Sequence, residues 1–356
     1  MIAATRAQDN THDDTSACHL DARPLVSVCI ANYNGEAFIR ECLDSVLNQT
    51  GSPSFEIIVH DDASTDGSLD QITSYPMVRV IRSATNVGYC VANNRMATVA
   101  RGAYLLLLNN DAVLEPDALS TLMASATTMA TPAILGLRQY DYHSRNFIDA
   151  GAWLDLFMSP IPIRRDEPTH PAMVIGACLW IPHSLWDELG GFPEWFHTNA
   201  EDVYLCCAAR MRGYDIFVPN VSGYLHRVGA TLSNRSGDSD KLTTTIRRRY
   251  LSERNRTRLM LIFYPWPLLI VALMLHLSTL LIEGIVVAAA NRDSNILIEI
   301  YMHAMRDVEW RSLQLSAARR QVAATRQIPF YAFLSRFRVI PSKIRSVVHL
   351  GLPRVR

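Results

Sequence analysis

The chain has 356 residues, which is enough for one large domain and an appendage. Its 34 lysines and arginines balance 34 aspartates and glutamates, so bulk charge argues against nucleic acid as a partner. The seven cysteines contain no CxxC pair, and we expect buried free thiols in a reducing cytosol. Residues 1–23 are polar and lack the apolar core of a signal peptide, so they are expected to form a disordered leader.

Short apolar runs alternate with helical spacing in the first third of the chain. Strands are expected at residues 25–31, 55–59, 77–81 and 104–108, and helices at 36–48, after Gly67, and at 89–100. Such alternation predicts an α/β fold with a mostly parallel sheet and right-handed crossovers.

The run at residues 104–108 is continuously apolar and stops at Asn109, Asn110 and Asp111. It suits a strand buried on both faces, whose polar end lies at the carboxyl edge of the sheet, where open α/β sheets bind ligands. A carboxylate and two amides there can hold a divalent cation, which suggests a phosphate-bearing substrate. A plain turn is the alternative reading of these three residues.

Three further polar clusters lie at expected strand ends or helix starts, at residues 32–35, 61–62 and 86–88. In a parallel sheet these loops share one edge, so together with residues 109–111 they can line one pocket.

The pattern loosens after Pro116. Helices are expected at 117–129, 182–189 and 201–212, and strands at 133–137, 173–181, 214–218 and 221–228, while residues 140–171 read as irregular. From residue 246 an arginine-rich run precedes an almost wholly apolar stretch at 259–290, and the tail is again basic. About 20 apolar residues span a bilayer, so this stretch predicts membrane association, with basic flanks toward anionic lipid. Spanning, lying in the interface, a buried hairpin and a homodimer contact all remain open.

The segments SVCIANYNG, IIVHDDASTDGS, NVGYCVANN and LLLLNNDAVL, in this order, resemble the nucleotide-sugar half of family 2 glycosyltransferases. The later segment GACLWIPHSLWDELGGFPEWFHTNAEDVYLCCAARMRGYDIFVPN resembles the acceptor half, and the nearest subgroup is rhamnosyltransferase-like. The resemblance implies a GT-A fold over residues 24–245, divided at about residue 115, followed by a helical, membrane-associated region at 246–356.

The resemblance also implies roles for individual residues. Asp202 would be the catalytic base, with Glu201 beside it, and Asp111 with His226 would bind Mg²⁺ or Mn²⁺. Asn109 stands where the family's first metal-binding carboxylate would be, which weakens the case for tight metal binding. Acceptor contacts are assigned to Gly176, Trp195, Phe196 and His197, although the last three could equally be core. Donor contacts are assigned to Ala31, Asn32, Tyr33, Asn34, Glu36, Asp61, Asp62, Asn86, Gly88, Asn93, Asn109, Asn110 and Asp111.

These roles imply transfer of a sugar, rhamnose among the candidates, from a dTDP- or UDP-sugar to a saccharide or lipid-linked acceptor at the cytoplasmic face of a bacterial inner membrane. The cation would stabilise the leaving diphosphate, and one carboxylate base would give inversion. We expect the dipole of the following helix to keep Asp202 ionised, with Glu201 opposing it. The alternatives are an acidic helix cap at Glu201 and Asp202, an inactive scaffold of the same shape, and a nucleotidyltransferase.

Overall fold

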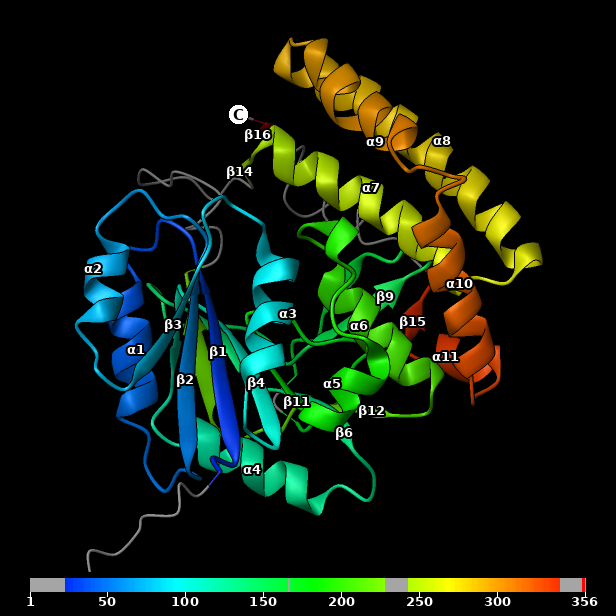
Figure 1. Cartoon of the computed structure of the whole chain (residues 1–356). Helices are drawn as coiled ribbons and strands as arrows, with labels where there is room; N and C mark the ends of the chain where they lie inside the picture. The colour runs from blue at the N-terminus through cyan, green and yellow to red at the C-terminus, as the bar shows by residue number, and fades with distance from the viewer. Residues whose placement is uncertain (1–22, 166, 228–242, 340–353, 356) are drawn as a thin grey trace, which may run out of the picture.

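The computed structural model describes residues 23–165, 167–227, 243–339 and 354–355. Its centre is a seven-stranded sheet, shown in Figure 1. The strands are, in spatial order, β12 (Asp215–Phe217), β6 (Ala133–Gly136), β11 (Cys178–Pro182), β4 (Tyr104–Asn109), β1 (Val26–Asn32), β2 (Phe55–Asp61) and β3 (Val78–Arg82). Only β11 runs antiparallel to its neighbours, so the predicted mostly parallel sheet is confirmed.

Side chains alternate across the sheet and supply a core on each face. Val26, Val28 and Ile30 of β1 pack with α1 (Ile39–Leu47), α2 (Ser68–Thr73) and α4 (Ala118–Thr128). Cys29, between them, belongs to the core under α3 (Tyr89–Val99), α5 (His183–Leu189) and α6 (Glu201–Met211). This alternation is the period of two expected of a strand that is buried on both faces.

Residues 140–171, expected to be less regular, contain several strands of only three or four residues. A four-stranded sheet has the order β5 (Ala112–Leu114), β13 (Gly223–His226), β7 (Arg138–Asp141) and β8 (Phe147–Asp149). A second small sheet joins β10 (Pro160–Pro162), β9 (Ala152–Asp155) and β15 (Phe337–Arg338), and β14 (Thr243–Thr244) pairs with β16 (Arg354–Val355). These strands are two to four residues long, which is too short to show a clear alternation.

The expected strand at 173–181 is also shorter than predicted, since only β11 joins the central sheet. Met173 instead forms an isolated bridge with Ala152.

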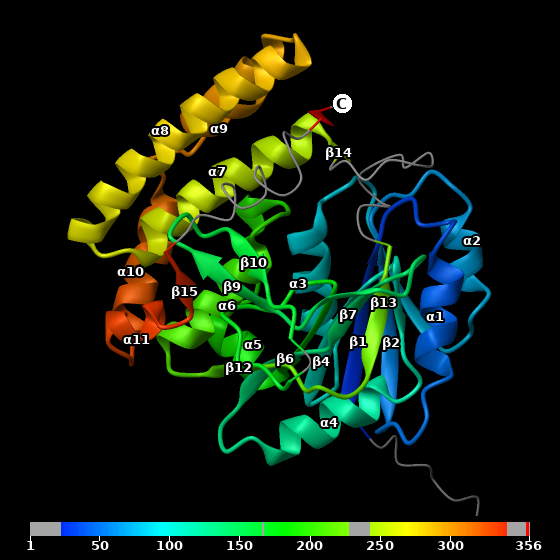
Figure 2. The ribbon, with the colours of Figure 1, turned by 180° about the vertical axis from the view of Figure 1, so that it is seen from behind.

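The apolar stretch at 259–290 is divided between two helices. α7 (Ile246–Phe263) ends in the main core, where residues 259–260 and 262–264 are buried, and α8 (Trp266–Asn291) begins after Pro265. Proline has no backbone N–H to continue the first helix, which explains the break. The chain continues through η2 (Leu297–Met302), α9 (His303–Arg306), α10 (Leu313–Thr325) and α11 (Phe330–Leu334). Figures 1 and 2 show α8 on the outer side of α7, away from the sheet.

α8 is long and apolar enough to cross a membrane by length and composition, with a mean hydropathy of 2.2 over its most apolar window. One face packs on the protein through Leu269, Ala272, His276, Leu280 and Gly284. The opposite face exposes a continuous apolar stripe, made of Trp266, Ile270, Val271, Met274, Leu275, Leu281, Ile282, Ile285 and Val286. Only 28% of the apolar window is buried, so the helix differs from an ordinary core helix.

The arginine-rich run that begins at residue 247 makes contacts within the protein that the sequence did not predict. Arg254 and Arg258 are buried, and Arg249 pairs with Glu253 and Glu283. Burial and pairing thus occupy these three arginines within the protein, whereas Arg247 of the same run is exposed. In the tail, the Arg336 and Arg338 guanidinium groups lie over the Trp153 ring.

Some predictions concern residues that the structure does not describe. Lys343, Arg345, Arg356 and the expected leader at residues 1–22 lie outside the described residues, as does Cys18. The six described cysteines are buried and free, as predicted.

Candidate active site

The carboxyl ends of β1, β2 and β4 bring the predicted donor residues together. Strand register places Asn32 opposite Asp61 and Ala31 opposite Asn109. The buried Asn32 amide nitrogen donates to Asp61 Oδ1 at 3.0 Å, and Asn110 Nδ2 donates to Asn32 Oδ1 at 2.9 Å. A Cβ at Gly35 would lie only 2.2 Å from Asn32 Oδ1, so this hydrogen-bonded pair requires glycine above it. The prediction that these strand ends share one edge is confirmed.

Asp62 holds the start of α3 against the same edge. Its carboxylate accepts hydrogen bonds from Val87 N at 2.7 Å and Gly88 N at 2.8 Å. Gly88 has a φ of +90°, a conformation that favours glycine. Asp62 therefore acts on the backbone, and its neighbour Asp61 is the carboxylate that lies among the side chains of the edge.

The other predicted donor residues divide into two groups. Tyr33 and Asn86 are exposed, so both are accessible to a ligand. Asn34, Glu36 and Asn93 are tied to backbone: Asn34 Oδ1 accepts from Thr65 N, Glu36 Oε2 accepts from Gly67 N, and Asn93 Nδ2 donates to Tyr89 O. Asn34, Glu36 and Asn93 therefore stabilise the conformation of two loops and a helix.

Asp111 and His226 meet although 115 positions separate them in the sequence. Pairing of β5 with β13 sets His226 opposite Ala112, and His226 Nε2 lies 3.3 Å from Asp111 Oδ1. Behind the imidazole, Gln139 Nε2 is 3.2 Å from His226 Nδ1, and the Tyr224 hydroxyl donates to Gln139 Oε1 at 3.0 Å. Sequence reasoning missed Gln139 and Tyr224, since a single buried polar residue on a short strand carries no motif.

The donor set at this point suits a divalent cation that shares its ligands with a substrate. Among the described residues, no group of three or more His, Cys, Asp or Glu side chains is arranged to hold a metal. Mg²⁺ sites commonly use one or two carboxylates together with substrate phosphates and water. Asp111 and His226 fit that pattern, with His226 offering Nε2 when the Gln139 amide is turned to accept from Nδ1–H.

Asp202 is linked to the donor edge through a single short segment, Gly176 and Ala177. The Gly176 N–H donates to Asp202 Oδ2 at 3.1 Å, and the next carbonyl, Ala177 O, accepts from Asn109 N at 3.0 Å. The pKa of the buried Tyr224 hydroxyl is raised by burial first and then by the charges of Asp149, Asp111 and Asp202, among others.

The two acids at the start of α6 are both hard to ionise. Burial raises the pKa of Asp202, and burial followed by the charge of Asp202 raises the pKa of Glu201 to about 8. The pKa of Asp202 is thus shifted in the direction opposite to that expected from the helix dipole, because the loss of water around a carboxylate outweighs the dipole. The raised pKa of Asp202 lies closer to neutral pH than that of an ordinary aspartate, and a general base works best when its pKa is near the working pH.

The predicted acceptor residues lie in the loop before α6, which contains η1 (Glu194–Phe196). Phe196 is fully buried in the core, so its ring is out of reach of a sugar and its assignment as an acceptor contact is wrong. Trp195 is half-buried and His197 is exposed. Gly176 is also buried, and it contributes backbone, because its N–H binds Asp202 and its carbonyl accepts from Tyr89 OH.

Comparison with known proteins finds a family match over part of the chain. Residues 27–189 match Glycosyl transferase family 2. The chain is 39% identical over 104 residues to hyaluronan synthase of Pasteurella multocida, covering 28% of this chain and 10% of that protein. It is 37% identical over 100 residues to poly(ribitol-phosphate) beta-glucosyltransferase of Bacillus spizizenii, covering 26% and 16%. The chain thus spans a small part of the length of these relatives.

A solved structure supports the fold over most of the chain. The crystal structure of GalNAc-T7 with UDP, GalNAc and Mn²⁺ aligns with a TM-score of 0.59 and 14% sequence identity, covering 94% of this chain and 59% of that one. At this identity the likeness concerns the fold, and it agrees with the sheet described above. The chain therefore contains a glycosyl transferase family 2 domain, at residues 27–189, on a GT-A-like fold.

Proposed function

We propose that the chain is an inverting glycosyltransferase that moves a sugar from a nucleotide-diphosphate donor to a saccharide or lipid-linked acceptor in bacterial surface polysaccharide synthesis. One observation carries this proposal: Asn109, at the start of the Asp111 triplet, and Asp202 are both fixed by the segment Gly176 and Ala177. A donor group and a base that are held by one rigid segment can act on the two sides of one sugar.

The donor half would bind the nucleotide sugar and would form no covalent bond with it. Asp61, beside Asn32, would contact the nucleotide, which we propose to be UDP or dTDP, with rhamnose a candidate sugar from the motif resemblance. Asp111 and His226 would hold Mg²⁺ or Mn²⁺ against the diphosphate. When bound, such a cation neutralises charge that develops on the leaving group.

The acceptor half provides the base. Asp202 would accept the proton of the acceptor hydroxyl as that oxygen attacks the anomeric carbon, and a single displacement inverts the configuration. Its carboxylate is oriented by Gly176 N and Val203 N, at 3.1 and 2.8 Å. Glu201, whose pKa burial and the neighbouring Asp202 raise to about 8, stays protonated near neutral pH, so we assign the role of base to Asp202.

Association with the cytoplasmic face of a membrane would follow from α8. Its inner face packs on α7 and η2, and only the outer stripe from Trp266 to Val286 is open. An apolar stripe on one side of a protein-bound helix suits insertion into the interface plane, so we propose lying on the membrane over spanning it. A lipid-linked acceptor would then be delivered to the same surface.

Thermal unfolding with candidate donors tests the proposal. The protein is mixed with Mn²⁺ and each of a panel of UDP- and dTDP-sugars, and donors that stabilise it are then tested for transfer. A ligand at 100 times its dissociation constant adds about 2.7 kcal/mol to the free energy of unfolding. Stabilisation that is lost in Asp111→Ala, followed by sugar transfer, supports the proposal. A panel in which no nucleotide sugar stabilises the protein contradicts it.

A further inference from the structure

The backbone that leads into α6 adopts an unusual conformation. Between η1 and Glu201, three non-glycine residues have positive φ: His197 at 64°, Asn199 at 66° and Ala200 at 75°. Such conformations are sparsely populated and persist only when the surroundings impose them. We call residues 195–200 the approach loop, since it ends at the candidate catalytic pair.

Every carbonyl from residue 195 to residue 199 accepts a hydrogen bond from outside the loop. Asn255 Nδ2 lies 3.1 Å from Phe196 O, 3.0 Å from Thr198 O and 2.8 Å from Asn199 O. Arg258 Nη1 donates to Trp195 O at 3.0 Å, and Arg254 Nη2 to Phe196 O at 3.3 Å. The remaining carbonyl, His197 O, accepts from Cys90 N of α3 at 3.2 Å.

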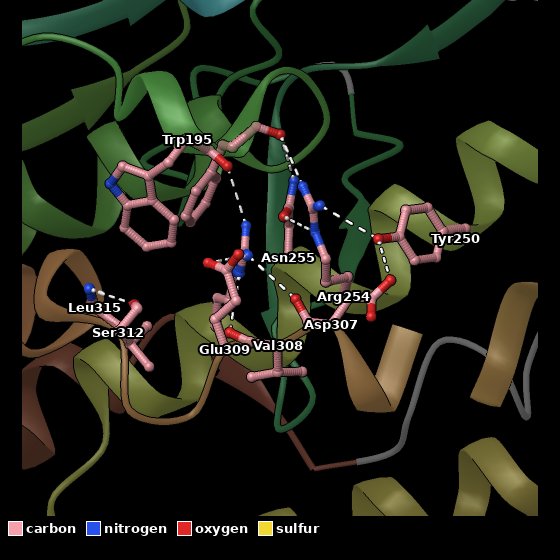
Figure 3. A network of polar contacts seen from close by, with 11 residues as sticks. Trp195, Tyr250, Arg254, Asn255, Asp307, Val308, Glu309, Ser312 and Leu315 are labelled. Carbon is pink, nitrogen blue, oxygen red and sulfur yellow. Dashed lines mark hydrogen bonds and ion pairs between the residues drawn. The ribbon is translucent and has the colours of Figure 1, made fainter. Parts of the chain in front are cut away.

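The α7 residues that make these bonds are themselves fixed. Figure 3 shows Arg254 and Asn255, both on α7, pointing toward the loop. Arg258, also on α7, binds the segment after α9 as well. Arg258 donates to Asp307 O and Val308 O and pairs with Glu309 at 3.0 Å. The Tyr250 hydroxyl bonds Asp307 at 2.9 Å and lies 3.4 Å from Arg254 Nη1. Asn255 has no exposed surface, so its amide is available only to the loop and to Arg254.

We propose that Asn255, supported by Arg254 and Arg258, is a positioning residue that sets the conformation of the approach loop and thereby the place at which Glu201 and Asp202 enter the site. This inference rests on the proposed function for its consequence in transfer, although the contacts stand without it. Burying a carbonyl without a partner is costly. The two N–H groups of the Asn255 amide are shared among three carbonyls, of which Phe196 O also accepts from Arg254. Its loss would release the loop and displace the base, while the donor edge at Asn32, Asp61 and Asp111 would stay intact.

The test compares Asn255→Ala with Thr257→Val in the full chain. Thr257 is a matched control, because it is also fully buried on α7 and its hydroxyl bonds Glu253 O and His276, not the approach loop. Amide hydrogen exchange of peptides covering residues 195–204, the donor dissociation constant and kcat are measured for both variants. Arg254→Met replaces Asn255→Ala if the latter does not fold; it removes the 3.3 Å bond to Phe196 O together with the bonds to Asn255 Oδ1 and the Tyr250 hydroxyl.

We expect exchange in residues 195–204 to rise at least about tenfold in Asn255→Ala alone. We expect kcat to fall about 10- to 100-fold, the scale of misplacing a reacting group, with donor affinity within about twofold of wild type. Unchanged exchange in the loop overturns the proposal, as does a kcat that falls equally in Thr257→Val or stays at the wild-type value. If the wild-type chain transfers no sugar, the proposed function fails, and the exchange result alone decides whether Asn255 holds the loop.

Discussion

Glu201→Gln should stabilise the protein in a manner that depends on pH. The Glu201 side chain is 6% exposed, and its Oε2 finds no hydrogen-bond partner among the described residues. Its pKa is raised from 4.5 to about 8, first by burial and then by the charge of Asp202. The folded state therefore binds the Glu201 proton more tightly than the unfolded chain does.

The sign and size of the effect follow from this difference. Below about pH 4.5 both states are protonated and Glu201 costs nothing, whereas at higher pH the unfolded chain loses its proton first, and stability falls until about pH 8. One pKa unit corresponds to about 1.4 kcal/mol, so the penalty is about 3 kcal/mol at pH 7 and at most about 5 kcal/mol above pH 8. A glutamine of similar shape carries no such penalty.

Denaturant unfolding of both proteins between pH 5 and pH 9 measures the effect. The difference in the free energy of unfolding between Glu201→Gln and wild type should be small at pH 5 and grow with pH. A difference that does not change with pH, or a variant that becomes less stable toward pH 9, would refute the burial argument for Glu201.

Three further predictions concern transfer and location. Asp202→Asn should lower kcat about 10²- to 10⁴-fold by removing the base, with the donor dissociation constant unchanged; equal losses in both would refute its role. Asp111→Ala should weaken donor binding and its dependence on Mn²⁺ together, and full wild-type activity in a chelator would remove the metal from the scheme. Met274→Lys with Ile282→Lys, on the exposed face of α8, should reduce cosedimentation with anionic lipid vesicles at least about tenfold, and unchanged cosedimentation would place the membrane contact elsewhere.

The vesicle experiment has a matched control. Met77 is 64% exposed, close to the 66% of Met274, but it lies directly before β3, the edge strand of the central sheet. Met77→Lys should leave cosedimentation unchanged. Substitutions are preferable to deleting residues 246–356, because α7 places Leu259, Met260 and Phe263 in the main core.

The donor edge was predictable because a polar residue follows the apolar run of each strand and marks its end. Apolar runs stop at Asn32, Asp61 and Asn109, and a parallel sheet gathers such ends at one edge without further information. The pairing of Asp111 with His226 was implied only by the family resemblance, because it depends on the register of β5 and β13, which such short strands do not reveal. The raised pKa of Asp202 was not predictable, because it results from burial, and the sequence at the start of a helix does not indicate how deeply that helix is buried.

The role of α7 was hidden by its composition. Arginines in a run suggest a solvated or lipid-facing surface, yet Arg254, Asn255 and Arg258 share a helical face with Leu251 and Leu259, at spacings of three and four residues. Polar residues set among buried leucines on one face indicate a buried network, and this spacing is the signal that could have identified it. The separation of α7 from α8 follows from Pro265. Counting apolar residues along the stretch does not reveal this break.

The convergence of Asp111 and Asp202 on one donor sugar is tested most directly by a crystal structure of the chain with Mn²⁺ and a nucleoside diphosphate. We expect the metal to contact Asp111 and the diphosphate, with the Asp202 carboxylate facing the terminal phosphate across a space that a sugar would fill. A nucleotide bound away from Asp111, or an Asp202 side chain that opens into a separate cavity, would contradict the account.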